Sequence, residues 1–309
     1  FIQIQFLLYL CHMENFVVSA RKYRPVTFDS VVGQAHITTT LRNAIKSNQL
    51  AQAFLFTGPR GVGKTTCARI LAKTINCLDV NEHTEPCNKC SSCRNFDLNA
   101  SFNIHELDAA SNNSVEDIRN LIDQVRFPPQ DGKYKVYIID EVHMLSQAAF
   151  NAFLKTLEEP PSYAIFILAT TEKHKILPTI LSRCQIFDFN RIQIKDMSDH
   201  LAKIAEKEGI GFEVEALELI AQKADGGLRD ALSMFDLNVT FSADRKLSYK
   251  DVLENLHVLD YDYYLKMLDV LHEGNITQVL LILNEIISKG FDVHQFVVGL
   301  NEHFRNILV

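Results

Sequence analysis

The sequence predicts an α/β fold with a parallel sheet, followed by a region made only of helices. Over the first 190 residues, short apolar runs rich in β-branched and aromatic residues alternate with helical patterns, as they do when helices cover both faces of a parallel sheet. A glycine-rich loop at residues 58–65 joins one of these runs to a helix. After about residue 190 the strand signal disappears.

Five apolar runs are predicted to be the strands of one parallel sheet. Their near-continuous apolarity fits strands that are buried on both faces. The runs are residues 53–57 (AFLFT), 103–107 (NIHEL), 135–139 (KVYII), 164–170 (AIFILAT) and 185–189 (QIFDF).

Between the strands, residues 146–159 have the clearest helical period. Apolar side chains recur there at positions i, i+3, i+4 and i+7, which places them on one face of a helix. They are Phe150, Phe153, Leu154 and Leu157. Two prolines at 160–161 then end the helix.

The later part of the chain predicts helices in two groups. Residues 196–208, 213–224 and 228–238 form the first group, with a break at the glycine pair 226–227. A polar stretch at 242–246 precedes the second group, at about 248–257, 261–272, 276–289 and 292–308. We therefore expect an α/β domain to residue 190, a small helical domain at 191–243 and a second helical domain at 244–309.

Charge and composition limit the kind of protein. The 309 residues carry a net charge of −7, with 47% hydrophobic and 22% charged residues, as in an ordinary soluble protein. The negative charge argues against a protein that coats nucleic acid by itself, although a ring of several subunits could combine local basic patches. No apolar run reaches the ~18 residues of a membrane-spanning helix, so no membrane partner is expected.

The first twelve residues differ from the rest of the chain. They are apolar but lack the positive region and the cleavage site of a signal peptide. Met13 is followed by a sequence that reads like a normal start, so we expect residues 1–12 to lie upstream of the native start; otherwise they form an extra apolar segment on the body. Seven cysteines without a secretory signal indicate a reducing compartment, and the predicted location is the cytoplasm.

The loop after the first strand predicts a phosphate site. Residues 58–65 (GPRGVGKT) match the pattern G-x-x-x-x-G-K-[ST]. The glycines let backbone N–H groups turn inward, Lys64 reaches the β and γ oxygens, and Thr65 offers its hydroxyl to Mg²⁺. The predicted phosphate-binding residues are Gly58, Gly61, Val62, Gly63, Lys64, Thr65 and Thr66. A chance glycine-rich turn is the alternative, but the required strand before and helix after are both present.

An acidic pair at the end of the third strand completes the predicted catalytic set. Asp140 ends the apolar run VYIID and suits Mg²⁺ coordination. Glu141, next to it, can act as the general base on the attacking water. Such pairs often only cap the next helix, but together with the phosphate loop they indicate a nucleoside triphosphatase.

Four clustered cysteines predict a metal site between the phosphate-loop helix and the next strand. Cys77, Cys87, Cys90 and Cys93 have C-x₉-C-x₂-C-x₂-C spacing, which can close a tetrahedral Zn²⁺ shell with no open position. The zinc would therefore be structural. The alternatives are structural or redox cysteines, an iron–sulfur cluster, or His83 in place of one cysteine.

Several further motifs resemble the clamp-loader ATPases of the AAA+ superfamily. They are ARKYRPVTFDSVVGQ at 20–34, DEVHML at 140–145, FLKTLEEPP at 153–161, LATTE at 168–172 and ILSRC at 180–184. From about residue 13 to the end, the chain is similar to the gamma/tau family of bacterial DNA polymerase III. The resemblance implies an AAA+ ATPase core at 13–190 with a zinc module at 77–93, a three-helix lid at 191–243, and the first part of a helical collar at 244–309.

The resemblance also implies roles for residues on either side of the nucleotide. Arg24 and Val32 would contact the adenosine end of ATP. Thr171, or else its neighbour Thr170, would sense the γ-phosphate from a strand tip. The choice between these two threonines stays open.

Two arginines are implied to act on the γ-phosphate. Arg183, in the SRC motif, would reach into the ATP site of the neighbouring subunit as an arginine finger. Arg229, in GGLRDALS, would grip the γ-phosphate from the lid. From the residues alone, Arg183 could instead form a surface ion pair, and Arg229 could belong to the charge pattern at a helix start.

Clamp loaders use ATP binding to open a ring-shaped sliding clamp and hydrolysis to release it on primed DNA. The resemblance therefore implies ATP, Mg²⁺ and Zn²⁺ as cofactors, and the delta and delta-prime subunits of a pentameric ring, the sliding clamp and primed DNA as partners. The polymerase core would be reached through a C-terminal region that is missing here, and no polymerase active site is identifiable.

Three rival interpretations remain. A non-hydrolysing subunit of the same loader would have a damaged phosphate loop, whereas here the loop and acidic pair are intact. Another AAA+ machine, such as a branch-migration helicase, is disfavoured by the cysteine insert and the SRC motif. A zinc-dependent DNA-binding module is disfavoured by the closed four-cysteine shell and the acidic charge.

Overall fold

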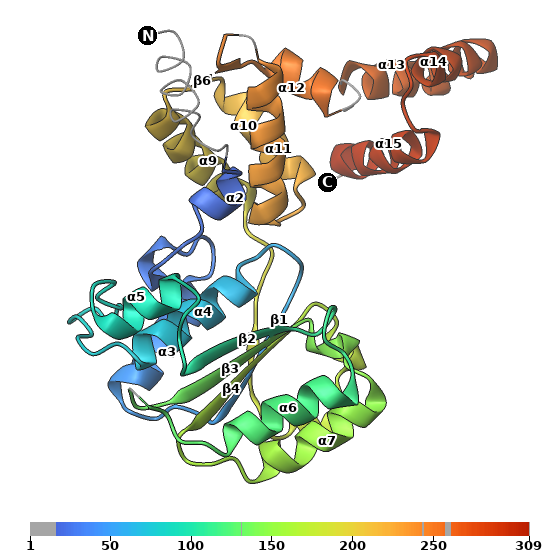
Figure 1. Ribbon diagram of the computed structural model, residues 1–309. Coiled ribbons are helices and arrows are strands. Elements are labelled where there is room, and N and C mark those ends of the chain that lie inside the picture. Colours follow the sequence, from blue (N-terminus) through green and yellow to red (C-terminus); the bar gives the residue numbers. More distant parts are fainter. Residues whose placement is uncertain (1–16, 131, 243, 257–260, 309) are drawn as a thin grey trace, which may run out of the picture. The chain divides into compact units, whose positions relative to one another are not determined.

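The computed structural model describes residues 17–130, 132–242, 244–256 and 261–308 (Figure 1). The expectation for residues 1–12 lies outside the described residues. The chain divides into two compact units. The first takes in the described residues up to Leu201 together with Ala221–Asp236, and the second takes in Ala202–Ile220 and the described residues from Leu237 onward. The domain limits expected at residues 190 and 243 stay predictions.

The first unit is built on a five-stranded parallel sheet with the strand order β2-β3-β4-β1-β5. The strands are β1 (Ala53–Thr57), β2 (Ile104–Asp108), β3 (Lys135–Asp140), β4 (Ala164–Thr170) and β5 (Gln185–Asp188). Each predicted strand is present, with its ends shifted by no more than one residue. The predicted α/β fold with a five-stranded parallel sheet is therefore confirmed.

Helices cover both faces of this sheet (Figure 1). In β1, Phe54 and Phe56 belong to one core and Leu55 to the core on the opposite face, because successive side chains of a strand point to opposite sides. This explains why the central strands are apolar at nearly every position. The first core includes side chains of α3 (Ala35–Lys46), α4 (Lys64–Ile75) and α5 (Ser91–Asp97), and the second includes side chains of α6 (Val115–Val125) and α7 (Gln147–Glu158).

Helix α7 confirms the predicted apolar stripe. Phe150, Phe153 and Leu157 are buried, and Leu154 is partly buried against the same core. The Ser146 hydroxyl accepts a hydrogen bond from the N–H of Ala149 and so caps the helix start.

Helix α6 was missed by the sequence analysis, although its start follows a recognisable pattern. The Ser114 hydroxyl accepts a hydrogen bond from the Asp117 N–H, and the Asp117 carboxylate accepts one from the Ser114 N–H. This reciprocal arrangement is a capping box, with aspartate in place of the usual glutamate. The pattern S-x-x-D before an apolar run could have identified the helix.

The helices after residue 190 agree with the predicted ones to within two or three residues. They are α9 (Ile194–Glu208), α10 (Val214–Lys223), α11 (Leu228–Phe241), α12 (Tyr249–Asn255), α13 (Tyr261–His272), α14 (Ile276–Ser288) and α15 (Val293–Leu308). Helices α3 and α5, by contrast, were, like α6, not predicted. The expected end of strand structure at residue 190 is wrong in one detail. Two two-residue strands, β6 (Gly211–Phe212) and β7 (Lys246–Leu247), pair in parallel, and both are too short to give an alternating pattern.

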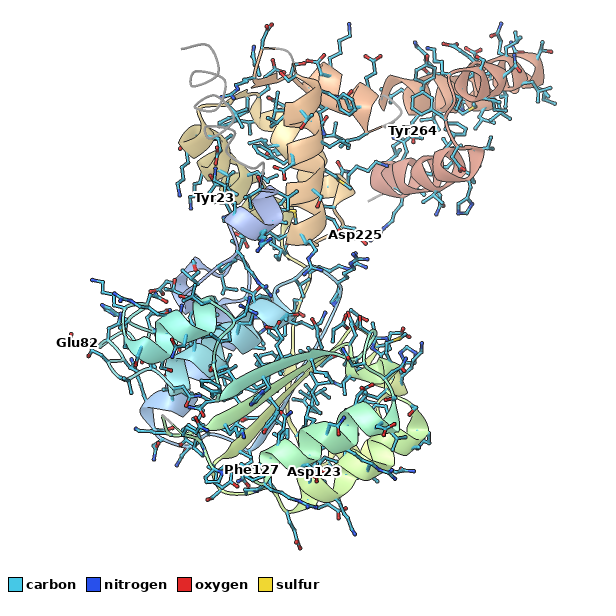
Figure 2. All side chains as sticks on the ribbon, in the orientation of Figure 1. Tyr23, Glu82, Asp123, Phe127, Asp225 and Tyr264 are labelled. Atoms are coloured by element: carbon cyan, nitrogen blue, oxygen red, sulfur yellow. The ribbon has the colours of Figure 1, made fainter. Side chains whose placement is uncertain are left out.

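The last three helices share a small apolar core. Met267, Ile286 and Phe296 are buried together there, and the ring of Tyr264, labelled in Figure 2, stacks on Phe296 at 5.6 Å between centroids. No helix in the described ranges is both long enough and apolar enough to span a bilayer.

Candidate nucleotide site and four-cysteine cluster

The loop between β1 and α4 has a backbone that requires glycine. Gly58, Gly61 and Gly63 have φ angles of +143°, +77° and +102°, which side-chain-bearing residues rarely adopt. A Cβ on Gly58 would also lie 2.3 Å from the carbonyl oxygen of Phe189. At Gly63 no atom lies within 4 Å of such a Cβ, so there the backbone conformation alone demands glycine.

Lys64 is the first residue of α4 and lies against this loop. Its ammonium donates hydrogen bonds to the carbonyl oxygens of Gly58 and Pro59 at 2.8 Å and 2.7 Å. Burial lowers the pKa of Lys64 below its usual value, while Glu141 and Asp140 act in the opposite direction. The cation is thus held at the positive end of the helix dipole, where an anion binds favourably.

Thr65 and Asp140 meet at the carboxyl edge of the sheet. The Thr65 hydroxyl donates to Oδ2 of Asp140 at 2.6 Å, and Oδ1 of Asp140 accepts the N–H of Glu141 at 3.0 Å. A hydroxyl and a carboxylate side by side are the ligands that Mg²⁺ takes beside bound phosphates. These two residues therefore fit the predicted magnesium site.

Glu141 is paired with the residue after β4. Its Oε2 accepts hydrogen bonds from the backbone N–H of Thr171 at 3.2 Å and from the Thr171 hydroxyl at 2.9 Å. Thr170 is fully buried, and its hydroxyl lies 3.0 Å from Nδ1 of His143 instead. Of the two candidate threonines, it is Thr171 that contacts the predicted general base.

His143 is a neighbour of the acidic pair that the sequence analysis missed. It lies in the 3-10 helix η2 (Val142–Met144) with a side chain only 6% exposed. Its Nδ1 is 3.4 Å from Oε2 of Glu141, and its Nε2 is 3.3 Å from Oε1 of Glu172. The imidazole therefore joins the tip of β3 to the segment after β4. Its position in the segment DEVHML, two residues after Glu141, could have identified it from the sequence.

The phosphate loop and the acidic pair line one pocket of about 290 Å³. We call its polar side the phosphate half, formed by residues 60–66 with Asp140, Glu141 and Arg229. We call its other side the apolar half, formed by Val18, Tyr23, Pro25, Val31, Val32, Ile192, Leu228 and Leu232. Arg24 also lines the pocket, whereas Gly58, Thr171 and Arg183 are not among the lining residues.

Buried contacts join the separate segments of the apolar half. The Gln34 amide donates to the carbonyl oxygen of Asn190 at 2.7 Å and accepts the Asn190 N–H at 3.3 Å. A Cβ on Gly33 would lie 2.9 Å from Cγ2 of Ile192, and the Ile192 N–H donates to the carbonyl oxygen of Gly226 at 3.1 Å. Only the folded chain brings these segments together, and most of their residues were not predicted.

Arg24 and Arg229 both approach the phosphate loop. Nε of Arg24 donates to the Thr66 hydroxyl at 3.3 Å, and burial, followed by the nearby Arg69, lowers the pKa of Arg24. The N–H of Arg229 donates to the Gly61 carbonyl oxygen at 3.4 Å. The structure thus brings both residues to the pocket that the resemblance assigned them to.

Arg183 lies apart from the other predicted residues. It follows α8 (Pro178–Leu181), and its guanidinium contacts Oε1 of Glu158 at 2.8 Å and the carbonyl oxygen of Thr179 at 2.6 Å. Its side chain is 34% exposed. Exposed pairs of this kind contribute little to stability, so the ion pair leaves Arg183 available for another contact.

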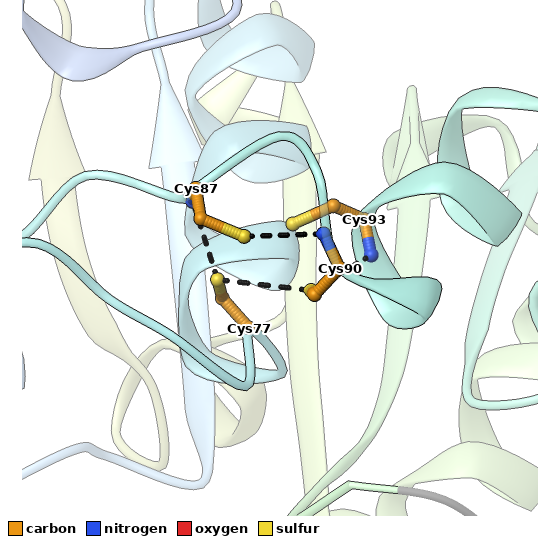
Figure 3. A group of neighbouring side chains, drawn as sticks. All are labelled: Cys77, Cys87, Cys90 and Cys93. Atoms are coloured by element: carbon orange, nitrogen blue, oxygen red, sulfur yellow. Dashed lines mark hydrogen bonds between the residues drawn. The ribbon is translucent and has the colours of Figure 1, made fainter.

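The four predicted cysteines form one cluster (Figure 3). All four sulfurs lie within 4.8 Å of one another, and those of Cys77 and Cys90 are 4.0 Å apart. A tetrahedral zinc site with Zn–S bonds of about 2.3 Å separates its sulfurs by about 3.8 Å, so the arrangement fits zinc. His83, the alternative ligand, does not belong to the cluster.

Backbone N–H groups surround the cluster as they do around thiolates. The N–H of Cys87 donates to Sγ of Cys77 at 3.2 Å, and the N–H of Cys90 donates to Sγ of Cys87 at 3.3 Å. The N–H groups of Lys89 and Cys90 lower the pKa of the Cys87 thiol to about 6. Metal-binding cysteines must be deprotonated, and the backbone favours that form at Cys87, whereas burial raises the pKa of the Cys77 and Cys93 thiols.

Comparison with known proteins links the chain to bacterial replication proteins. Residues 33–193 match the family described as "DNA polymerase III, delta subunit", and residues 196–244 match the one described as "DNA polymerase III clamp loader subunit, ATPase lid domain". The tau subunit of DNA polymerase III from Bacillus subtilis is 47% identical over 292 residues, which are 94% of this chain and 51% of the relative. The tau subunit from Escherichia coli is 43% identical over 92% of this chain and 44% of the relative.

A shorter relative is covered more fully. The gamma subunit of DNA polymerase III from Buchnera aphidicola is 38% identical over 96% of this chain and 79% of its own length. The chain thus spans about half the length of the two tau subunits and most of this gamma subunit. Among solved structures, the RuvB Holliday junction branch migration motor of Thermotoga maritima matches with a TM-score of 0.57 and 20% identity over 87% of this chain and 86% of that one. This likeness shows a shared fold alone.

Proposed function

Because the chain belongs to the gamma/tau family of DNA polymerase III clamp-loader subunits, we propose that it is an ATPase motor of a clamp loader. In this role it binds ATP to help open a sliding clamp and hydrolyses ATP to leave the clamp on primed DNA. The observation that carries the proposal is the set of hydrolytic residues that this chain itself supplies at the phosphate half of the pocket. Thr65 contacts Asp140 there, and Glu141 stands beside them.

The geometry supports a distinct role for each residue. The triphosphate occupies the loop of residues 58–64, and the Lys64 ammonium, held by two loop carbonyls, is in reach of its β and γ oxygens. Thr65 and Asp140 would hold Mg²⁺, and the ion would supply positive charge beside those oxygens. Glu141 accepts the proton of the attacking water, and Thr171 orients the Glu141 carboxylate through the two hydrogen bonds that it donates.

The neighbouring subunit completes the site. Arg183 lies outside the pocket of its own chain and is partly exposed, as a residue must be if it reaches the ATP of an adjacent subunit. There it neutralises the charge that develops on the transferred phosphoryl group. Arg229, which lines the pocket, grips the γ-phosphate from within the same chain.

We propose the same partners as for the family. The chain works beside delta and delta-prime subunits in a pentameric ring, acts on a sliding clamp and primed DNA, and serves the polymerase III holoenzyme. Because its bacterial relatives are DNA polymerase subunits, we propose that it works in the cytoplasm. The four cysteines hold a structural Zn²⁺, since a closed shell of four sulfurs offers no position for a substrate.

The rival interpretations account for less of the structure. A non-hydrolysing loader subunit fits the family match at residues 33–193. Such a subunit, however, would not need the Thr65–Asp140 contact or Glu141. A branch-migration helicase shares the fold. The cysteine cluster between α4 and β2 and the SRC motif at Arg183 disfavour that interpretation.

The decisive experiment measures the ATPase rate of the protein mixed with its loader partners, with and without clamp and primed DNA. Glu141→Gln serves as the blank. A rate that rises sharply with clamp and primed DNA, and disappears in the blank, is the expected result. A rate that responds to neither would leave an ATPase but remove the clamp-loader assignment.

A further inference from the structure

The cysteine insert contacts the segment that leads into the apolar half of the pocket. Glu85 lies in this insert, two residues before Cys87, with a side chain only 5% exposed. Its Oε2 accepts the backbone N–H of Phe28 at 2.8 Å, and its Oε1 accepts the N–H of Asp29 at 3.1 Å. One carboxylate thus holds the start of the 3-10 helix η1 (Phe28–Ser30).

The same carboxylate is paired with a cation. The guanidinium of Arg42, on α3, contacts Oε1 of Glu85 and also Oδ1 of Asp29. A buried carboxylate is stable when charge-assisted hydrogen bonds satisfy it, as they do here. Loss of the Glu85 charge would weaken the hydrogen bonds from the two backbone N–H groups and remove one of the two carboxylates that Arg42 contacts.

A short path leads from η1 to the pocket. The Val31 N–H donates to the Phe28 carbonyl oxygen at 3.2 Å, and Val31 and Val32 line the apolar half. Phe28 is 1% exposed and belongs to the core beneath. A shift at η1 therefore moves the valines that would face a bound base.

The insert itself has few internal contacts apart from the cysteines. Within the loop, the Glu85 N–H donates to Oδ1 of Asn81 at 2.8 Å, and the Asn81 N–H donates to the Glu85 carbonyl oxygen at 3.2 Å. The ends of the loop converge on the four sulfurs. Small cysteine-rich segments depend on their metal for order, so the position of Glu85 depends on the cluster.

We propose that Glu85 is a positioning residue through which the metal-bound insert sets the apolar half of the pocket, and hence the affinity for the base of the nucleotide. The inference rests on the proposed ATP site and goes beyond it, since it assigns the insert a part in nucleotide binding. It predicts that the base end of ATP loses affinity when Glu85 or the metal is lost, whereas the grip on the phosphates stays.

The test compares two ligands that share the phosphate end. The dissociation constants of Mg-ATP and of tripolyphosphate are measured by calorimetry for the wild-type protein, Glu85→Gln and Glu82→Gln. Glutamine keeps the size of Glu85 but loses its charge and one acceptor. Glu82, labelled in Figure 2, is an exposed glutamate of the same loop and provides the matched control.

For Glu85→Gln we expect ATP to bind about tenfold more weakly, because the displaced valines lose apolar contact with the base, with tripolyphosphate affinity unchanged. Glu82→Gln should bind both ligands as the wild type does. Removal of metal from the wild type by a chelator should cause the same selective loss, and added Zn²⁺ should restore ATP affinity. In Glu85→Gln the chelator should have little further effect, because the link is already broken.

Either of two results would overturn the inference: unchanged ATP affinity in Glu85→Gln or in the metal-free protein, or an equal loss of ATP and tripolyphosphate affinity in either. Ligand binding by the wild-type protein distinguishes a failure of this inference from a failure of the proposed ATPase function. If the wild-type protein binds neither ligand, the ATP site itself is wrong and the inference falls with it. If it binds both and Glu85→Gln binds both equally well, only the inference is wrong.

Discussion

The two halves of the pocket are assembled in different ways. The phosphate half comes mainly from two short stretches, residues 60–66 and 140–141, each at the carboxyl end of a buried strand. The apolar half collects side chains from stretches near residues 18–32, 192 and 228–232. Phosphates and Mg²⁺ need particular atoms at fixed positions, and consecutive residues at a strand end provide them. A base needs mainly apolar surface, which distant parts of the chain can supply.

The largest expected effect is on the hydrolysis rate and concerns Arg183, the residue that one subunit would add to the phosphate half of its neighbour. Arg183→Ala should lower the hydrolysis rate of the assembled ring by about 10³-fold or more, as loss of an arginine finger does, with the ATP dissociation constant unchanged. The two quantities are measured by steady-state ATPase assay and calorimetry.

Glu158→Ala is the matched control, since it removes the ion-pair partner of Arg183 and leaves the guanidinium in place. It should hydrolyse ATP at close to the wild-type rate. Equal losses in the two variants would mean that Arg183 serves only the surface pair.

The next prediction tests whether ATP binding and ATP hydrolysis depend on different residues of the phosphate half. Glu141→Gln should lower kcat by about 10²–10⁴-fold, the usual contribution of a general base, while ATP still binds. Single-turnover hydrolysis and a binding titration measure the two properties. The exposed Glu159 gives a control variant, Glu159→Gln, which should retain full activity. A Glu141→Gln protein that hydrolyses ATP normally would remove Glu141 from the mechanism.

A substitution in the apolar half should weaken ATP binding, whereas the preceding substitutions lower the hydrolysis rate and leave binding unchanged. Ile192 is 4% exposed and lines this half, so Ile192→Ala should weaken ATP binding about tenfold, the effect of removing roughly 1–2 kcal/mol of apolar contact. Tripolyphosphate affinity should not change. Ile194→Ala alters an isoleucine that is 47% exposed and should leave both affinities unchanged. A matching loss of both ligands in Ile192→Ala would show that the halves do not act separately.

The smallest expected effect is on kcat and concerns His143, which contacts Glu141 of the phosphate half. His143→Ala should lower kcat about fivefold, since a typical hydrogen bond contributes about 1 kcal/mol, with little change in the KM for ATP. The cause would be a less well-oriented Glu141 carboxylate. His174, 75% exposed and 3.5 Å from the same Glu172, provides the control His174→Ala. A change in KM without a change in kcat would point to a packing role for His143.

The contrast between the halves explains what the sequence could predict. The bounds of β1 and β4 were predicted correctly because both strands are buried at every position and therefore form continuous apolar runs in the sequence. The phosphate loop and the acidic pair lie directly after such runs. Their chemistry is carried by consecutive residues, and their positions follow from the strands.

The rest depends on contacts between distant residues. Ile192 and Leu232 look like ordinary core residues in the sequence, and only the folded chain brings them beside Val32. The role of His143 could not be identified from its own segment, because its partner Glu172 follows a different strand. Val32 itself was named from the family resemblance, and neither period nor spacing distinguishes it from Val31.

The position of β1 in the sheet has a consequence for synthesis of the chain. β1 pairs with β4 and β5, and Ala53 finds its partner Phe166 more than a hundred residues later. At about 5–20 residues per second, the segment AFLFT waits on the ribosome for roughly 5–20 s before either neighbour exists. It is apolar, uncharged and rich in aromatic residues, the composition that favours aggregation while exposed. The strand that carries the phosphate loop is therefore a part of the nascent chain that a chaperone would protect.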